Sequence, residues 1–75
     1  MNWTVPWCNE AGQVRWQPQL PSGDRLWIDS RRWWMWEPTS SAPPVLYRSE
    51  RRAERIARRE HKRAQRNSWV RKVPQ

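Results

Sequence analysis

The sequence predicts a small α+β protein, in which a Trp-rich antiparallel β-meander of three or four short strands precedes one long basic helix. Two observations predict this fold class. Apolar side chains recur at every second position in several short runs of the first half of the chain, which is the period of a half-buried strand. The second half contains a long segment without Gly or Pro that is rich in Arg, Glu and Ala, and these residues favour helices.

Turn signals separate the short runs and define the expected strands. Between Gln13 and Leu20 apolar and polar residues alternate strictly, which assigns Gln17 to the polar side of a strand. Asn9–Gly12 and Pro21–Asp24 are the expected turns, because glycine adopts positive φ without strain. The strand-forming runs are Trp3–Trp7, Gln13–Leu20, Arg25–Asp29 and Trp33–Trp36.

The composition changes along the chain and predicts four segments. Residues 38–44 are rich in Pro and Ser, which is typical of a stiff, extended linker. Pro44 suits the first position of the helix that follows, and Ser49 followed by Glu50 is an alternative start. The expected segments are the β-meander over 1–37, the linker over 38–44, the basic helix over 45–68 and a C-terminal tail over 69–75.

Charge is divided unequally between the two halves. Residues 1–44 have four basic and four acidic side chains, whereas residues 45–75 have eleven basic and three acidic ones, a net charge of +8. A chain of 75 residues with one cysteine supports one small domain without an internal disulfide. It has no apolar run of the roughly 18 residues that span a membrane and no secretory signal pattern at its start. We therefore expect a cytoplasmic protein, or one inside a virion or nucleoprotein assembly.

The basic side chains of the predicted helix fall on one side. At 100° per residue all of them lie within a stripe of about 140°. On the opposite side are Leu46, Ala53, Ala57 and Ala64, with Ile56 and Glu60 nearby, and we expect this alanine face to pack on the sheet or on another protein. The basic stripe consists of Arg48, Arg51, Arg52, Arg55, Arg58, Arg59, Lys62, Arg63 and Arg66.

Segregated charge of this kind predicts a polyanionic partner. Basic residues four positions apart repel by about 0.2–0.5 kcal/mol per pair, so a face meant only for solvent would include glutamates. Arginine favours bidentate phosphate and guanine contacts, and a helix of about 22 residues is roughly 33 Å long, close to one duplex turn. Nucleic acid, RNA or DNA, is the expected partner.

One short segment of the helix resembles a known family. The pentamer Glu50-Arg51-Arg52-Ala53-Glu54 is similar to the arginine-rich helix of lambdoid-phage antitermination N proteins. The resemblance covers five contiguous residues and implies an RNA-binding helix. The tryptophan that stacks on the RNA loop in that family falls at Arg59 here, so that stacking contact does not carry over.

The tryptophans allow three interpretations: a core, anchors for a larger protein assembly, or platforms for base stacking. As anchors they would belong to an adaptor, a phage virion component or an inhibitor of a nucleic-acid machine. Trp69 either folds back on the sheet or stacks on a base. A membrane surface is disfavoured because the non-basic face of the helix contains Ala and Glu. The eight residues are Trp3, Trp7, Trp16, Trp27, Trp33, Trp34, Trp36 and Trp69.

Catalytic and metal chemistry find no support in the sequence. Cys8 and His61 are the only residues of their types, and a zinc site needs about four ligands. We expect Cys8 to be a small buried thiol and His61 a solvated imidazole on the helix. The prediction is a protein without enzymatic activity, cofactor, metal or small-molecule substrate.

Overall fold

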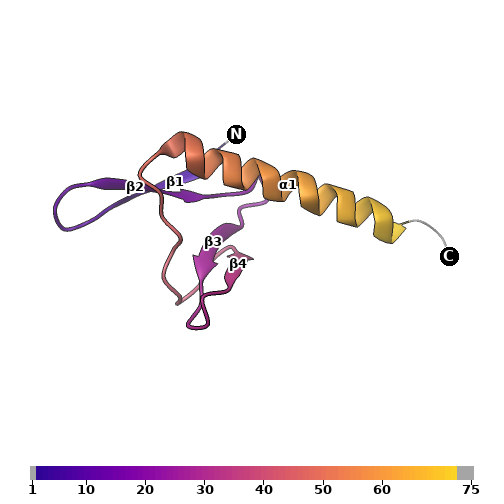
Figure 1. Ribbon diagram of the computed structural model, residues 1–75, viewed down its shortest axis with the longest axis horizontal. Coiled ribbons are helices and arrows are strands. Elements are labelled where there is room, and N and C mark those ends of the chain that lie inside the picture. Colours follow the sequence, from indigo (N-terminus) through magenta and orange to yellow (C-terminus); the bar gives the residue numbers. More distant parts are fainter. Residues whose placement is uncertain (1, 73–75) are drawn as a thin grey trace.

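The computed structural model describes residues 2–72, with side chains described over residues 2–66, and it has the predicted α+β fold (Figure 1). The first of two β-hairpins lies against one long helix, the second hairpin lies below it in the view of Figure 1, and the C-terminal part of the helix extends past both. The molecule measures 54 × 27 × 16 Å. Its elements are β1 (Thr4–Cys8), β2 (Val14–Pro18), β3 (Arg25–Ile28), β4 (Trp34–Glu37) and α1 (Glu50–Lys72).

The first hairpin forms where the alternating pattern and the turn residues predict it. Strands β1 and β2 pair antiparallel from Thr4 opposite Pro18 to Cys8 opposite Val14. Gly12 closes the turn with a φ of +78°. The side chain of Asn9 fixes the same turn by accepting a hydrogen bond from the backbone N–H of Gln13 at 2.9 Å.

The second hairpin depends on an aspartate and on one strained residue. The carboxylate of Asp29 accepts hydrogen bonds from the backbone N–H groups of Arg31 and Trp33, at 2.8 and 2.9 Å. Arg32 lies between them with a φ of +63°, a conformation that costs a non-glycine residue about 1–2 kcal/mol. The bonds to Asp29 hold the turn in spite of that cost.

The four strands form two separate two-stranded sheets, whereas the sequence predicts one meander. Pairing between β2 and β3 is limited to a bridge from Gln19 to Arg25. Pro18 and Pro21 flank this point, and neither has an N–H to donate to a ladder. Gly23 then reverses the chain with a φ of +98°, and β3 continues into its own hairpin with β4.

Residues 43–47 connect the two hairpins, although their composition predicts the end of a linker and the start of a helix. Tyr47 and Trp16 exchange two backbone hydrogen bonds, of 2.8 and 2.9 Å. The N–H of Val45 donates to Leu26, and the N–H of Ile28 donates to Pro43, at 3.1 and 2.9 Å. This segment, here called the tie segment, is therefore extended and lies along an edge of both β2 and β3.

The helix begins at Glu50, the later of the two starts that the sequence offers. The side chain of Ser49 accepts a hydrogen bond from the N–H of Arg52 at 3.3 Å, which is the N-cap interaction that ends the preceding extended chain. The helical backbone continues to Lys72, four residues beyond the predicted end at 68.

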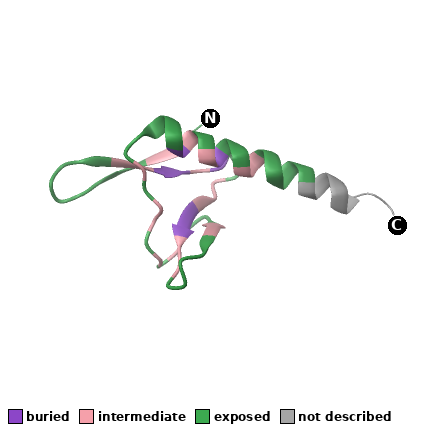
Figure 2. Ribbon diagram, viewed as in Figure 1, coloured by how far each residue is buried: buried purple, intermediate pink, exposed green. Residues whose placement is uncertain are grey.

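The core lies where β2, β3 and the first half of the helix meet (Figure 2). Gln17 and Pro18 are adjacent in β2 and both are fully buried. Successive residues of a strand point to opposite faces, so both faces of β2 are covered, and the expected solvent-facing position of Gln17 is wrong. The buried apolar residues are Leu20, Leu26, Trp27, Ala53 and Ala57.

Candidate nucleic-acid interface

The alanine face of α1 packs on the strands and thereby fixes the direction in which the basic side chains point. Ala53 and Ala57 are completely buried, and the helix contacts β2 and β1. Alanine lets a helix approach a sheet closely, since its side chain is a single methyl group. The expected packing of this face on the sheet is confirmed at these two residues, whereas Ala64 is exposed.

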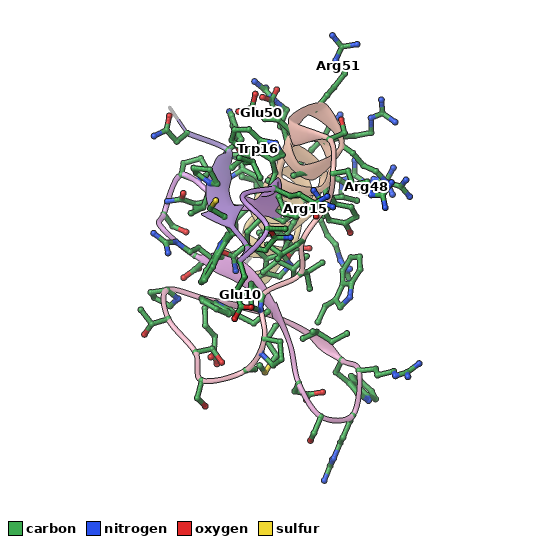
Figure 3. All side chains as sticks on the ribbon, turned by 90° about the vertical axis from the view of Figure 1, so that its left-hand side faces the viewer. Glu10, Arg15, Trp16, Arg48, Glu50 and Arg51 are labelled. Atoms are coloured by element: carbon green, nitrogen blue, oxygen red, sulfur yellow. The ribbon has the colours of Figure 1, made fainter. Side chains whose placement is uncertain are left out.

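All nine residues of the predicted basic stripe are exposed. Eight of them belong to α1, and Arg48 precedes the helix, because the helix begins at Glu50. Figure 3 views the molecule from the side on which the helix begins, and it shows Arg48 and Arg51 projecting away from the strands. The stripe thus forms one continuous basic surface opposite the packed face.

Little acidic charge neutralises the stripe. Of the side chains described, the helix has one ion pair, in which Nε of Arg58 lies 2.8 Å from a carboxylate oxygen of Glu54. Five pairs of basic residues are spaced i, i+4 within α1, and each is unfavourable by about 0.2–0.5 kcal/mol. These pairs are 51/55, 55/59, 58/62, 59/63 and 62/66.

Two aromatic rings position individual arginines of the stripe. The guanidinium carbon of Arg58 lies 4.8 Å from the ring centre of Trp3, and that of Arg52 lies 5.6 Å from the ring centre of Tyr47. Contacts of this geometry are attractive by about 0.5–1 kcal/mol at exposed sites. Arg58, held by both Trp3 and Glu54, is the member of the stripe with the least freedom to meet a ligand.

Tyr47 is half-buried under the start of the helix, and this changes its acidity. Burial raises the pKa of its phenol above the ordinary value of 10.0, because the charged phenolate loses solvation. The nearby guanidinium of Arg52 lowers the same pKa and so opposes part of the shift. The net effect is that the folded protein favours the neutral phenol.

Shallow hollows lie along the stripe in the part of the chain that the structure describes, and Arg59 lines three of them. The first, of about 390 Å³, is lined by Ser49, Arg51, Arg52, Arg55, Ile56 and Arg59. A second, of about 180 Å³, lies further along the helix and is lined by Arg59, Lys62, Arg63 and Arg66. Between them is the Trp–Arg groove, of about 160 Å³, which is lined by Trp34, Trp36, Ile56, Arg59, Glu60 and Arg63.

The tryptophans occupy different environments, which the sequence pattern did not separate. Trp27 is buried and donates a hydrogen bond from Nε1 to the carbonyl of Glu37 at 2.8 Å. Trp7 contacts its ring edge-to-face at 6.3 Å. Trp3, Trp16 and Trp36 are half-buried. Trp33 and Trp34 are 70% and 53% exposed, and the side chain of Trp69 lies outside the described residues.

The two residues weighed for nucleophilic or metal chemistry are placed differently from expectation. Cys8 is exposed near the end of the first hairpin, so the expected burial of its thiol is wrong. His61 is not fully solvated, because its ring packs edge-on against Trp3 with the centroids 5.4 Å apart. In the described part of the chain, no three His, Cys, Asp or Glu side chains lie where they could hold a metal ion.

Comparison of the chain with protein-family models, with curated proteins and with solved structures finds no match in any of the three. Over residues 2–72, α1 is too polar to cross a bilayer, and no helix there has the required apolar length.

Sequence reasoning identified the basic stripe but missed the Trp–Arg groove. The stripe follows from one periodic helix, whereas the groove brings together β4 and α1, which are separated in sequence by the tie segment and the chain before it. The sequence offers Trp34 and Trp36 as core residues or as anchors for a protein partner, and it does not predict their position beside the helix. The signal available in the sequence was an aromatic run, Trp33–Trp36, a short distance before an arginine-rich helix. That signal does not specify which of their side chains lie together.

Proposed function

We propose that this protein is a non-enzymatic nucleic-acid-binding protein that contacts phosphates through its basic stripe. The observation that carries the proposal is the separation of two faces on one helix. Ala53 and Ala57 are fully buried, while all nine basic side chains of the stripe are exposed with one ion pair among the described residues. The repulsion within this surface is relieved when a polyanion neutralises it.

The dimensions and the choice of residue support the same partner. The helix has 23 residues, which corresponds to about 35 Å, and the hollows along it are lined mainly by guanidinium groups. Arginine presents a planar set of donors that matches phosphate oxygens. We place the protein in the cytoplasm or inside a nucleoprotein assembly, where such a partner is present.

The test is the salt dependence of binding to a short duplex. If the stripe neutralises six phosphates, the logarithm of the affinity falls with the logarithm of salt concentration with a slope of about −5. The triple variant Arg55→Glu, Arg59→Glu and Lys62→Glu should abolish binding. Fluorescence anisotropy measures both, with circular dichroism to show that each variant is folded.

A matched control distinguishes a loss of affinity caused by changing the stripe from a loss caused by lower net charge alone. Changing Arg15, Arg31 and Arg32 to Glu removes the same amount of charge from the strand half of the molecule. This control should reduce duplex affinity far less than the triple variant in the helix. Equal losses in the two variants, or unchanged duplex binding in the helix variant, would refute the proposal.

A second candidate is docking on a larger protein assembly, as an adaptor or a structural component. It is favoured by one observation, the exposure of Trp33 and Trp34 at 70% and 53%, since tryptophan is enriched at the energetic centres of interfaces. Copurification before and after nuclease digestion distinguishes the two candidates. A protein partner held by these rings remains after digestion, whereas partners bridged by nucleic acid are lost.

A further inference from the structure

The Trp–Arg groove differs from the rest of the stripe because one of its walls is aromatic. Trp34 and Trp36 from β4 form that wall, and Ile56, Arg59, Glu60 and Arg63 from α1 form the other. Trp36 is half-buried and pairs with Leu26 across the second hairpin. Trp34 is 53% exposed, so part of its ring surface is open to a ligand.

The helix wall supplies two cations beside these rings. Arg59 and Arg63 are both exposed and lie one helical turn apart, about 6 Å along the axis. Each also lines the next hollow along the helix, together with Lys62 and Arg66. The chemistry of the groove is thus an aromatic surface beside a row of guanidinium groups.

Glu60 helps to define what the groove can hold. Glu60 lines the groove, and its negative charge would oppose a phosphate group bound there. The same carboxylate can accept a hydrogen bond from an amino or imino group on the edge of a nucleobase. The centre of the groove therefore suits a base, and the arginine-lined hollows on either side suit the phosphates that flank it.

We infer that the Trp–Arg groove binds an unpaired nucleobase of a single-stranded nucleic acid, stacked on Trp34 with its flanking phosphates at Arg59 and Arg63. This inference rests on the proposed function and names its substrate class. Bases in a duplex are stacked on their neighbours and do not offer a face to a side chain, whereas every unpaired base has one. Stacking is tolerant of sequence, so the groove should accept many single strands.

The experiment compares two adjacent tryptophans with two substrates. Full-length protein is titrated into a labelled unstructured single strand and into a duplex of the same length, using wild type, Trp34→Ala and the matched control Trp33→Ala. Trp33 is adjacent in sequence and more exposed, at 70%, and it does not line the groove. Trp34→Ala should weaken single-strand binding about tenfold or more and leave duplex binding within a factor of about two, whereas Trp33→Ala should change neither.

A further variant keeps the test valid if Trp34→Ala does not fold. Trp34→Phe retains an aromatic face in the strand and should preserve most of the single-strand affinity, while Trp34→Leu retains apolar volume and should lose it. Equal single-strand affinity for the Phe and Leu variants, or equal loss on both substrates, overturns the inference. A wild type that binds duplex but not single strands also overturns it and leaves the proposed function standing, whereas binding to neither substrate removes both.

Discussion

At the scale of single residues, Gln17 connects the two hairpins. Its side-chain nitrogen donates to the carbonyl of Leu26 at 2.8 Å, and its side-chain oxygen accepts from Nε1 of Trp7 at 3.0 Å. Because Gln17 is fully buried, water does not replace these partners. One amide group therefore satisfies polar atoms from both sheets in the centre of the molecule.

We predict that Gln17→Leu, which keeps a side chain of comparable size and removes both hydrogen bonds, lowers the free energy of unfolding by about 2 kcal/mol. The cost arises because Nε1 of Trp7 loses its acceptor, and because the carbonyl of Leu26 keeps only the hydrogen bond from the N–H of Val45. Urea denaturation followed by circular dichroism measures the change. The control Gln65→Leu, at an exposed position of the helix, should stay close to wild type, and a similarly small effect of Gln17→Leu would contradict the assigned role.

Tyr47 gives a second residue-scale prediction, on pH dependence. Burial raises its pKa above 10.0 in the folded protein, so the fold favours the neutral phenol. The resulting stability is fully present below the pKa of the unfolded chain and is lost as the pH rises through the higher, folded pKa. Stability should therefore fall in this alkaline range, and less so for Tyr47→Phe.

Since Tyr47 is the only tyrosine in the chain, an ultraviolet absorbance titration of the phenolate reports its pKa directly. The midpoint should lie above that of the unfolded chain in denaturant. Arg52→Ala should raise it further, because the guanidinium of Arg52 opposes the shift. A folded midpoint at or below the unfolded one would show that the phenol is solvated.

At the scale of elements, α1 contains pairs of like-charged side chains whose repulsion opposes folding. Arg55 takes part in two of the i, i+4 pairs of like charge, with Arg51 and with Arg59. We predict that Arg55→Glu stabilises the free protein by about 1 kcal/mol at low salt, because two repulsive pairs become attractive. The same change should weaken nucleic-acid binding.

Thermal denaturation across salt concentrations checks this prediction. The advantage of Arg55→Glu should disappear between about 0.01 and 1 M salt, as the screening length falls from about 30 Å to about 3 Å. Wild type should become more stable over the same range. A variant that is less stable than wild type at low salt would show that Arg55 makes a stabilising contact.

The elements also show how far the sequence predicts the structure. Periodicity and turn residues were sufficient for the strands, for the turns at Gly12 and Gly23 and for the helix, because these features depend on neighbouring residues. The pairing of Tyr47 with Trp16 was not predictable in this way, since its two halves are distant in sequence and Pro43-Pro44 resembles a linker. For the same reason the alternation that placed Gln17 outside was misleading, as β2 is covered on both faces by elements that follow it.

At the scale of the whole molecule, the two halves that composition separates form one structure. The helix rests on the first hairpin through Ala53 and Ala57, and it borders the second hairpin across the Trp–Arg groove. The neutral half thus does more than support the charged half, because it orients the helix and supplies the aromatic wall of the groove. Of the candidate site, the sequence predicts the charged surface, and tertiary contacts add the rings beside it.

The tie segment has a consequence for the newly made chain. Strands β2 and β3 are each paired in a hairpin on one edge, and residues 43–47 cover backbone groups on the other. Uncovered strand edges are templates for joining other chains and are a route to aggregation. During synthesis these edges stay open until Tyr47 leaves the ribosome, and the strongly charged helix follows immediately. Because of this order of segments, the aggregation-prone edges of β2 and β3 are covered just before the positively charged helix emerges. The charge of the helix then makes copies of the chain repel one another.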